Sequence, residues 1–383
     1  MIRIGISKTS GKKEVRYTGS GIGTAMTERF LELLATGRPI VFDGGTGTTL
    51  FDRGVFINRC YDQVNLTDPE LVRRVHREFV AAGAMVIETN TFGANRYKLA
   101  SFDLASKVRE INLAGASLAK EAAGPDVLVA GSVGPLGIHL EPLFRSTDES
   151  TAKDAFIEQI TALVDGGVDL ILFETFADME EARIALAAGM AVRQATGRDI
   201  PLACSFTVNQ EGNTIYGARA EEFAAMLEKA GADVMGINCS VGPKSMLDTL
   251  ERVRKVSRLP VIVMPNAGLP TEIEGRTFYM CSPDYMANYA RRFVQVGAAA
   301  VGGCCGTTPD HIRAIAASIR QMTGEQRSLQ EVSSLQEETV APMPEIPFAQ
   351  RSQFAKKLAA GDFVATVELA PPQGWDQIGR AHV

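Results

Sequence analysis

The sequence predicts a (β/α)₈ TIM barrel, in which eight parallel strands alternate with helices and close on themselves. From residue 39 to residue 320, short apolar runs rich in β-branched residues alternate with longer amphipathic segments rich in Ala, Glu, Leu and Arg. Eight such runs occur, and each is followed by a segment with helical character. Their almost unbroken apolar character is typical of parallel strands buried on both faces. An open, doubly wound sheet is the alternative that this pattern leaves.

The expected strands follow one another at regular intervals along the chain. They are 39–45 (PIVFDGG), 85–90 (MVIETN), 127–133 (VLVAGSV), 169–175 (DLILFET), 201–208 (PLACSFTV), 233–239 (DVMGINC), 260–266 (PVIVMPN) and 298–305 (AAAVGGCC).

Helix-start signals support the helical segments between these strands. Asp68 can cap a helix over 68–82, with Pro69 in its first turn. The segment 307–319 (TTPDHIRAIAASI) begins in the same way.

Composition limits the classes of function that fit the chain. A net charge of −6 over 383 residues, with no long basic run, argues against nucleic-acid binding. No stretch reaches the roughly 18 apolar residues of a membrane span. Six cysteines in a chain of this size do not resemble the disulfide framework of a small secreted domain. We therefore expect a soluble cytoplasmic protein whose partners are small molecules.

The chain divides into five parts by composition. The barrel should occupy 26–321, preceded by a disordered extension at 1–25. Residues 322–349 are polar, acidic and punctuated by proline, which predicts a linker. Residues 350–377 offer one short helix and one strand, too little to fold alone, and we interpret them as an incomplete second barrel. The tail 378–383 (IGRAHV) matches a reading frame of a common sequencing-library adapter, and we interpret it as artefactual.

Three cysteines follow predicted strands of the barrel. Cys239 ends the sixth strand, and Cys304 and Cys305 end the eighth. The active groups of such barrels lie where strands end and loops begin, so the three thiols should meet at one rim. Three thiolates with an open fourth position describe a catalytic Zn²⁺ site, in which a substrate thiol is held as its nucleophilic thiolate. The alternatives are a strained vicinal disulfide or small buried hydrophobic residues.

Adjacent cysteines can serve one metal ion only if the backbone leaves strand geometry. Consecutive residues on a strand point to opposite faces, which would separate Cys304 from Cys305. Gly302, Gly303 and Gly306 surround the pair and permit such a departure.

Acidic residues also follow predicted strands. Asp43, Glu88 and Glu174 each come after several apolar residues, where a charge is costly to bury unless it is paired. A substrate cation such as an amino-acid ammonium would suit this rim, and the exposed backbone N–H groups of the GGTGTT loop after Asp43 could hold its carboxylate. Helix caps are the alternative role for the three acids, and a tight turn is the alternative for the glycines.

With these motifs in place, residues 39–320 resemble a homocysteine S-methyltransferase domain. The segments FDGGTGTTL, IETNTFGANR, SVGPLG, FETFAD, GINCSVGP and GGCCGTTPDHI occur in the family's order. The resemblance implies a zinc barrel that transfers a methyl group to the thiol of L-homocysteine to form methionine. It implies these site residues: Cys239, Cys304 and Cys305 for zinc; Asp43 and Glu174 for the substrate ammonium; Gly44 and Gly45 near its carboxylate; and Asn90 and Asn238 lining the pocket.

The segment 363–376 (FVATVELAPPQGWD) resembles the start of methylenetetrahydrofolate reductase, including Glu368, Pro371 and Pro372. The natural full-length chain is therefore expected to carry a reductase domain that is missing here. No cobalamin-binding loop of the form D-x-H-x-x-G occurs, which favours S-methylmethionine or another small activated molecule as the methyl donor. Two alternatives are a non-catalytic zinc and homocysteine module that hands the thiolate to a cobalamin- or folate-linked partner, and a Schiff-base aldolase. No expected strand end carries the lysine that a Schiff-base aldolase requires, which argues against the aldolase.

Overall fold

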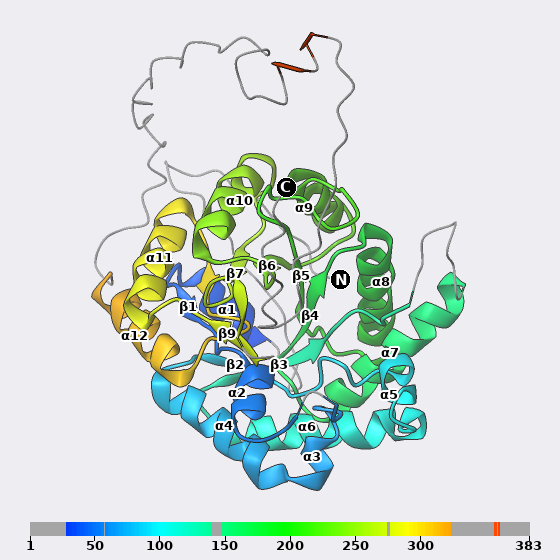
Figure 1. Ribbon diagram of the computed structural model, residues 1–383. Coiled ribbons are helices and arrows are strands. Elements are labelled where there is room, and N and C mark those ends of the chain that lie inside the picture. Colours follow the sequence, from blue (N-terminus) through cyan, green and yellow to red (C-terminus); the bar gives the residue numbers. More distant parts are fainter. Residues whose placement is uncertain are drawn as a thin grey trace, which may run out of the picture. The chain divides into compact units, whose positions relative to one another are not determined.

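Eight parallel strands form the centre of the computed structural model, which describes residues 28–56, 58–138, 148–273, 276–322, 356–357 and 359–360 (Figure 1). They are β1 (Ile40–Val41), β2 (Val86–Glu88), β3 (Leu128–Val133), β4 (Leu170–Phe176), β5 (Leu202–Phe206), β6 (Val234–Asn238), β7 (Val261–Met264) and β10 (Ala300–Val301). Each lies within, or within one residue of, a strand that the sequence predicts.

The sheet closes into a barrel, which confirms the predicted fold over the open-sheet alternative. Its strand order is β1-β10-β7-β6-β5-β4-β3-β2. The two ends of this order meet through a parallel bridge between Phe42 and Val86. Hydrogen bonds from the Asp43 amide to the Val86 carbonyl (3.1 Å) and from the Met85 amide to the Val41 carbonyl (2.7 Å) complete the closure.

Helices surround the barrel and connect its strands (Figure 1). They are α1 (Glu28–Ala35), α2 (Thr46–Asp52), α3 (Val64–Thr67), α4 (Pro69–Ala82), α5 (Arg96–Ala100), the 3₁₀ turn η1 (Ala105–Lys107), α6 (Val108–Ala123), α7 (Glu149–Asp165), α8 (Met179–Thr196), α9 (Ala220–Lys229), α10 (Pro243–Val256), α11 (Pro283–Val296) and α12 (Pro309–Gln321). Among the described residues, no helix is both long and apolar enough to cross a membrane.

Both predicted helix starts are confirmed. Asp68 is the N-cap of α4, where its side chain accepts a hydrogen bond from the Leu71 amide, and Pro69 is the first helical residue. At α12, Thr308 is the N-cap and forms a reciprocal capping arrangement with His311.

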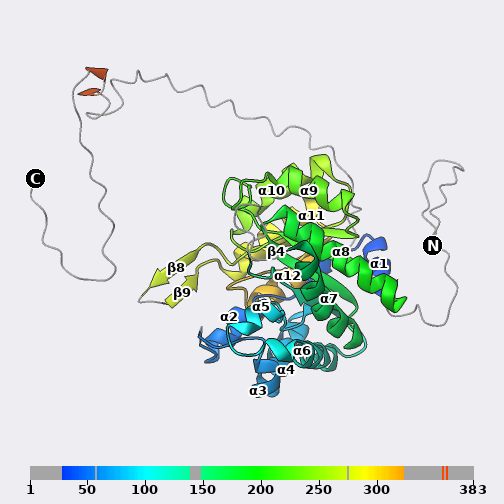
Figure 2. The same ribbon diagram turned by 90° about the vertical axis from the view of Figure 1, so that its right-hand side faces the viewer.

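Side chains on the barrel strands alternate between the interior and the surrounding helices. On β1, Ile40 and Phe42 belong to the interior cluster, whereas Val41 belongs to the core between strands and helices. Helix α1 covers the interior at one end of the barrel (Figure 2). Its Phe30 is fully buried and meets the Phe42 ring edge-on, with ring centroids 6.3 Å apart. The amino-terminal end of the barrel is therefore packed with apolar groups.

The interior becomes polar towards the carboxyl ends of four neighbouring strands. The inward positions that follow the apolar ones are Glu88 on β2, Ser132 on β3, Glu174 on β4 and Ser205 on β5, and all four side chains are buried. Because the carboxyl ends of parallel strands lie at one rim, this polar layer marks the end of the barrel that can hold a ligand.

The structure adds one feature that the sequence analysis did not predict. A two-stranded hairpin, β8 (Pro270–Ile273) with β9 (Arg276–Tyr279), follows β7 in the chain. Its strands are only four residues long, too short for a periodicity signal of their own.

Most of the segments predicted outside the barrel lie outside the described residues. These are the extension 1–25, nearly all of 322–349 and 350–377, and the tail 378–383.

Burial of His76 makes the stability of the barrel depend on pH. This side chain in α4 is fully buried, neither ring nitrogen has a hydrogen-bond partner in the part of the chain that the structure describes, and burial lowers its pKa to about 4. Between the unfolded pKa of 6.5 and the native value, the unfolded chain takes up a proton that the native protein does not. This group's contribution is thus present above pH 6.5 and is lost as the pH falls towards 4.

We expect wild type to lose about 3 kcal/mol of unfolding free energy relative to His76→Leu between pH 7 and pH 4. Denaturant unfolding of both proteins at each pH measures this difference, and other groups that titrate cancel in the comparison. A difference that does not change with pH would show that His76 is not held neutral by burial.

Candidate metal and substrate site

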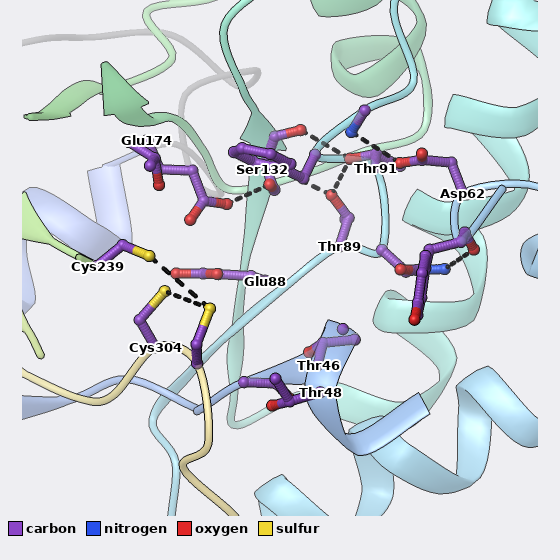
Figure 3. A pocket seen from close by; sticks show the side chains of 18 of the residues that line it. Thr46, Thr48, Asp62, Glu88, Thr89, Thr91, Ser132, Glu174, Cys239 and Cys304 are labelled. Carbon is purple, nitrogen blue, oxygen red and sulfur yellow. Dashed lines mark hydrogen bonds between the residues drawn. The ribbon is translucent and has the colours of Figure 1, made fainter. Parts of the chain in front are cut away.

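A pocket of about 640 Å³ opens at the carboxyl-terminal rim of the barrel. Its walls come from the segments that follow β1, β2, β4, β6 and β10, so residues far apart in the sequence face one space (Figure 3). The three cysteines singled out by the sequence lie at one side of it, and Glu88 and Glu174 line it beside them.

The thiols of Cys239, Cys304 and Cys305 form one cluster. The sulfur of Cys305 lies 3.8 Å from that of Cys239 and 4.0 Å from that of Cys304, and all three sulfurs lie within 4.8 Å of one another. Two thiolates bound 2.3 Å from a tetrahedral metal ion are about 3.8 Å apart. The spacing therefore fits three ligands of one metal ion, and it is too long for a disulfide, whose sulfurs are about 2.05 Å apart.

The backbone leaves strand geometry before the adjacent cysteines, as the glycines around them suggested. Strand β10 ends at Val301, and the Cys304 amide then donates to the Pro265 carbonyl at 2.8 Å. A side chain at Gly302 would collide with Phe42, because its Cβ would lie 2.7 Å from the Phe42 Cβ. After the pair, Gly306 has a φ of +77°, a conformation that glycine adopts readily.

The three thiols are unequal in acidity. Hydrogen bonds from Cys239 and Cys304 lower the pKa of Cys305 to about 3. Conversely, the pKa of Cys304 lies well above its ordinary value, because its thiol proton is shared with Cys239 and Cys305. Hydrogen bonds from the two neighbouring thiols thus favour the thiolate form of Cys305.

Glu174 is held in place by two neighbouring strands. Its Oε1 accepts a hydrogen bond from the Ser132 hydroxyl, and its Oε2 accepts one from the Asn238 side-chain amide at 3.3 Å. Burial raises the pKa of Glu174 to about 7, against the effect of the bond from Ser132. Its carboxylate is therefore oriented by the protein while it still lacks a cation in direct contact.

Asn238 ties the end of β4 to the end of β6. Its Nδ2 donates to the Thr175 hydroxyl at 2.8 Å, and its Oδ1 accepts from the Thr175 amide at 2.8 Å. Thr175 and the next residue after Asn238, Cys239, both have φ values near +60°, at 64° and 63°. Such conformations strain residues other than glycine, and clusters of them are typical of functional sites. Asn238 does not line the pocket itself.

Asp43 is buried next to the pocket residue Glu88 and is not itself a lining residue. It is fully buried, its Oδ2 accepts a hydrogen bond from the Glu88 amide at 2.9 Å, and its Oδ1 is buried without a partner among the described residues. Burial raises the pKa values of both Asp43 and Glu88 well above the ordinary range, and Glu174 adds to both shifts. None of the three acids caps a helix: Gly45, Asn95 and Asp178 occupy the N-caps that follow them.

The remaining predicted residues have mixed positions. Gly44, Gly45 and Asn90 line the pocket. The Gly45 amide already donates to the carbonyl and hydroxyl oxygens of Thr307, at 3.0 and 2.9 Å. The Asn90 side-chain amide donates to the Tyr61 carbonyl at 2.7 Å. Both groups therefore join loops of the rim to one another.

Several residues of the site were missed by the sequence analysis. Ser132 orients Glu174, Thr307 joins the first and last loops, and the field of Lys98 lowers the pKa of Glu174. Tyr279 of β9 hydrogen-bonds to Cys305, and its ring packs where a side chain at position 306 would lie. Only Ser132 had a signal, because it is a polar residue inside a predicted strand; the others act through contacts that spacing does not reveal.

The sequence model of the family described as homocysteine S-methyltransferase matches residues 40–319. The chain belongs to this family. Among curated relatives, the methionine synthases of Mycobacterium leprae and Mycobacterium tuberculosis are 36% and 34% identical to it, over 84% and 82% of this chain. The matched regions are only 28% and 27% of those proteins, so this chain spans about a quarter of their length.

Solved structures of the family share the barrel. The metallated form of the homocysteine methyltransferase MmuM from Escherichia coli superposes with a TM-score of 0.61 at 25% identity, over 75% of this chain and 98% of that one. The apo form of the same protein superposes with a TM-score of 0.57. The homocysteine S-methyltransferase barrel described here thus corresponds to nearly all of MmuM.

Substitution of any one of the three cysteines by alanine is expected to abolish stoichiometric metal binding, because two thiolates cannot hold the ion as three do. Metal content per chain, measured by elemental analysis after purification, is the readout. Cys281→Ala is the matched control, since Cys281 is a half-buried free thiol outside the cluster. Full metal content in Cys239→Ala would contradict the ligand assignment.

Proposed function

We propose that this chain transfers a methyl group to the thiol of L-homocysteine, forming methionine, with Zn²⁺ held by Cys239, Cys304 and Cys305. The observation that carries the proposal is the meeting of three thiols at metal-ligand spacing with two carboxylates in one pocket. Family membership supports the same reaction.

Thiolate ligands suit zinc, and three of them leave a fourth position for a substrate. Zinc bound in this way stabilises a substrate thiol as thiolate near neutral pH, although a free thiol has a pKa of about 8.5.

The acidic groups supply recognition of the amino acid. Glu174 is oriented by Ser132 and Asn238 towards the pocket, and Asp43 has an oxygen without a partner in the described residues. An ammonium between these carboxylates would offset the cost of burying them. The substrate carboxylate would lie by the loop of Gly44 and Gly45, which lines the pocket. Since the Gly45 amide is engaged by Thr307, Gly44 is the better donor of the two.

In the methyl transfer itself, the homocysteine sulfur forms a bond to the methyl carbon as the bond from that carbon to the donor breaks. The electron pair of the broken bond leaves with the donor. A sulfonium donor such as S-methylmethionine is already activated by its positive charge, and a pocket lined by buried carboxylates favours a cation over an anionic folate. MmuM is named a homocysteine methyltransferase, and this chain matches 98% of it. This match supports the proposal that a barrel of this size is enough for catalysis.

The alternative is a binding module that delivers the thiolate to a partner that carries the methyl group on cobalamin or folate. One observation favours it: the related methionine synthases are nearly four times longer than their matched regions.

An assay with each donor in turn separates the two functions. The zinc-loaded chain is incubated with homocysteine and S-methylmethionine, betaine or methyltetrahydrofolate, and methionine is quantified. We expect turnover with S-methylmethionine, loss of turnover after chelation, and recovery with added Zn²⁺. No methionine from any donor, despite tight homocysteine binding, would support the module. Full activity in the zinc-free protein would falsify the zinc site.

Asp43→Asn is expected to weaken homocysteine binding about tenfold to a hundredfold, since a charge-assisted hydrogen bond contributes roughly 1.5 to 3 kcal/mol. Asparagine keeps an oxygen that can accept from the Glu88 amide, so the local fold is retained. Binding of homocysteine and of 4-mercaptobutyrate, which lacks the amino group, is measured by calorimetry together with zinc content. The zinc content should be unchanged, and the affinity for 4-mercaptobutyrate should change little. Equal weakening of both thiols would show that Asp43 supports the loop rather than the ammonium.

A further inference from the structure

Glu88 is a pocket carboxylate that receives no side-chain or backbone hydrogen bond at its buried oxygen from the described residues. Its side chain is 9% exposed, it lines the pocket, and its Oε1 is buried without a hydrogen-bond partner among the described residues. By contrast, Glu174 receives bonds from Ser132 and Asn238, and Asp62, at the far side of the pocket, accepts from the Gly93 amide at 2.9 Å.

Charge makes the contrast sharper. The field of Lys98 favours the ionised forms of Glu174 and Asp62. Around Glu88, the charged groups that act on it are two more carboxylates, Glu174 and Asp43. A buried carboxylate with neither a hydrogen bond nor a counter-charge is costly, and native proteins retain such groups where a ligand completes them.

The strand order places Glu88 on the path between the two carboxylates already assigned to the substrate. Asp43 follows β1 and Glu174 lies on β4, while β2 and β3 are the strands between them. The inward side chains on these two intermediate strands are Glu88 and Ser132, so both lie between the strands that carry the two assigned carboxylates. In Figure 3 the Glu88 carboxylate points into the same space as Glu174 and the cysteines.

We propose that Glu88 is the third carboxylate of a tripod, with Asp43 and Glu174, that receives the α-ammonium of the substrate and selects amino-acid thiols over thiols without an amino group. This inference rests on the proposed function. An ammonium has three N–H donors, which matches one donor to each carboxylate. Ser132 is already committed to Glu174, so Glu88 supplies the remaining acceptor on this path.

The test compares Glu88→Gln with wild type in the zinc-loaded 383-residue chain. Glutamine keeps the size of the side chain and removes its charge. Binding of homocysteine should weaken about tenfold or more, whereas binding of 4-mercaptobutyrate should change less than about twofold. Calorimetry measures both affinities directly, so the result does not depend on turnover or on the donor. Zinc content should equal that of wild type.

Thermal unfolding provides a second readout. The proposal predicts a higher unfolding midpoint in Glu88→Gln, whereas a purely structural role for Glu88 predicts a lower one. Because the buried Glu88 carboxyl group lacks a hydrogen-bond partner at Oε1 among the described residues, its replacement should raise the unfolding midpoint of the substrate-free protein at neutral pH. The matched control is Glu181→Gln, a buried glutamate of α8 that accepts from the Leu136 amide at 2.7 Å and does not line the pocket. It should leave the ratio of the two thiol affinities unchanged.

Three results would overturn the tripod. Homocysteine binding that is unchanged in Glu88→Gln would exclude contact with the ammonium. Equal weakening of both thiols would assign Glu88 to the shape of the pocket, and a lower unfolding midpoint would assign it to the stability of the barrel. A chain that binds homocysteine selectively but forms no methionine would contradict the proposed catalysis while the tripod stands.

Discussion

Desolvation of negative charge is the constraint on which the rest of the site depends. Asp43, Glu88 and Glu174 are buried at one end of a barrel whose interior is otherwise apolar, and three thiols lie beside them. Each carboxylate has its pKa raised by burial. The described residues put no cation within ion-pair distance of these three, so a stable ionised state needs positive charge from ligands. Under the proposed function, a metal ion at the sulfurs and an ammonium at the carboxylates would supply it within one pocket.

Closure of the barrel brings the acidic residues and the cysteine cluster together. Strand β1 pairs with β10, so the loop that carries Asp43 lies against the loop that carries Cys304 and Cys305. The Gly303 amide donates to the Asp43 carbonyl at 3.0 Å, and the Gly45 amide donates to the Thr307 carbonyl. The contact is so close that Gly302 and Phe42 leave no room for a side chain at position 302. The cysteine cluster and the acidic group are therefore joined by hydrogen bonds at one rim of the barrel.

Sequence patterns predicted the strands and the cysteine cluster for the same reason. Burial on both faces produces apolar runs, and the ends of those runs identify one rim of a parallel barrel. The pattern also marked Asp43 and Glu174, but it could not distinguish a carboxylate that lines the pocket from one that is buried beside it. Asp43 and Glu88 follow similar apolar runs, yet Glu88 lines the pocket and Asp43 is fully buried next to it. That difference arises from the hydrogen bond between the Asp43 carboxylate and the Glu88 amide, a long-range contact that no spacing encodes.

The strained backbone at the strand ends follows from the same geometry. Thr175, Cys239 and Ser240 have left-handed φ values, and each such residue costs on the order of 1 kcal/mol or more. Hydrogen bonds support these conformations. The Asn238 side chain accepts from the Thr175 amide and donates to the Thr175 hydroxyl, and the Thr207 hydroxyl lies 2.5 Å from that of Ser240. In an extended strand Cys239 would point away from the face that Asn238 occupies. The left-handed turn instead lets Asn238 orient Glu174 while the next residue turns its sulfur to Cys305, so the carboxylate and the cysteine cluster are joined through one peptide unit.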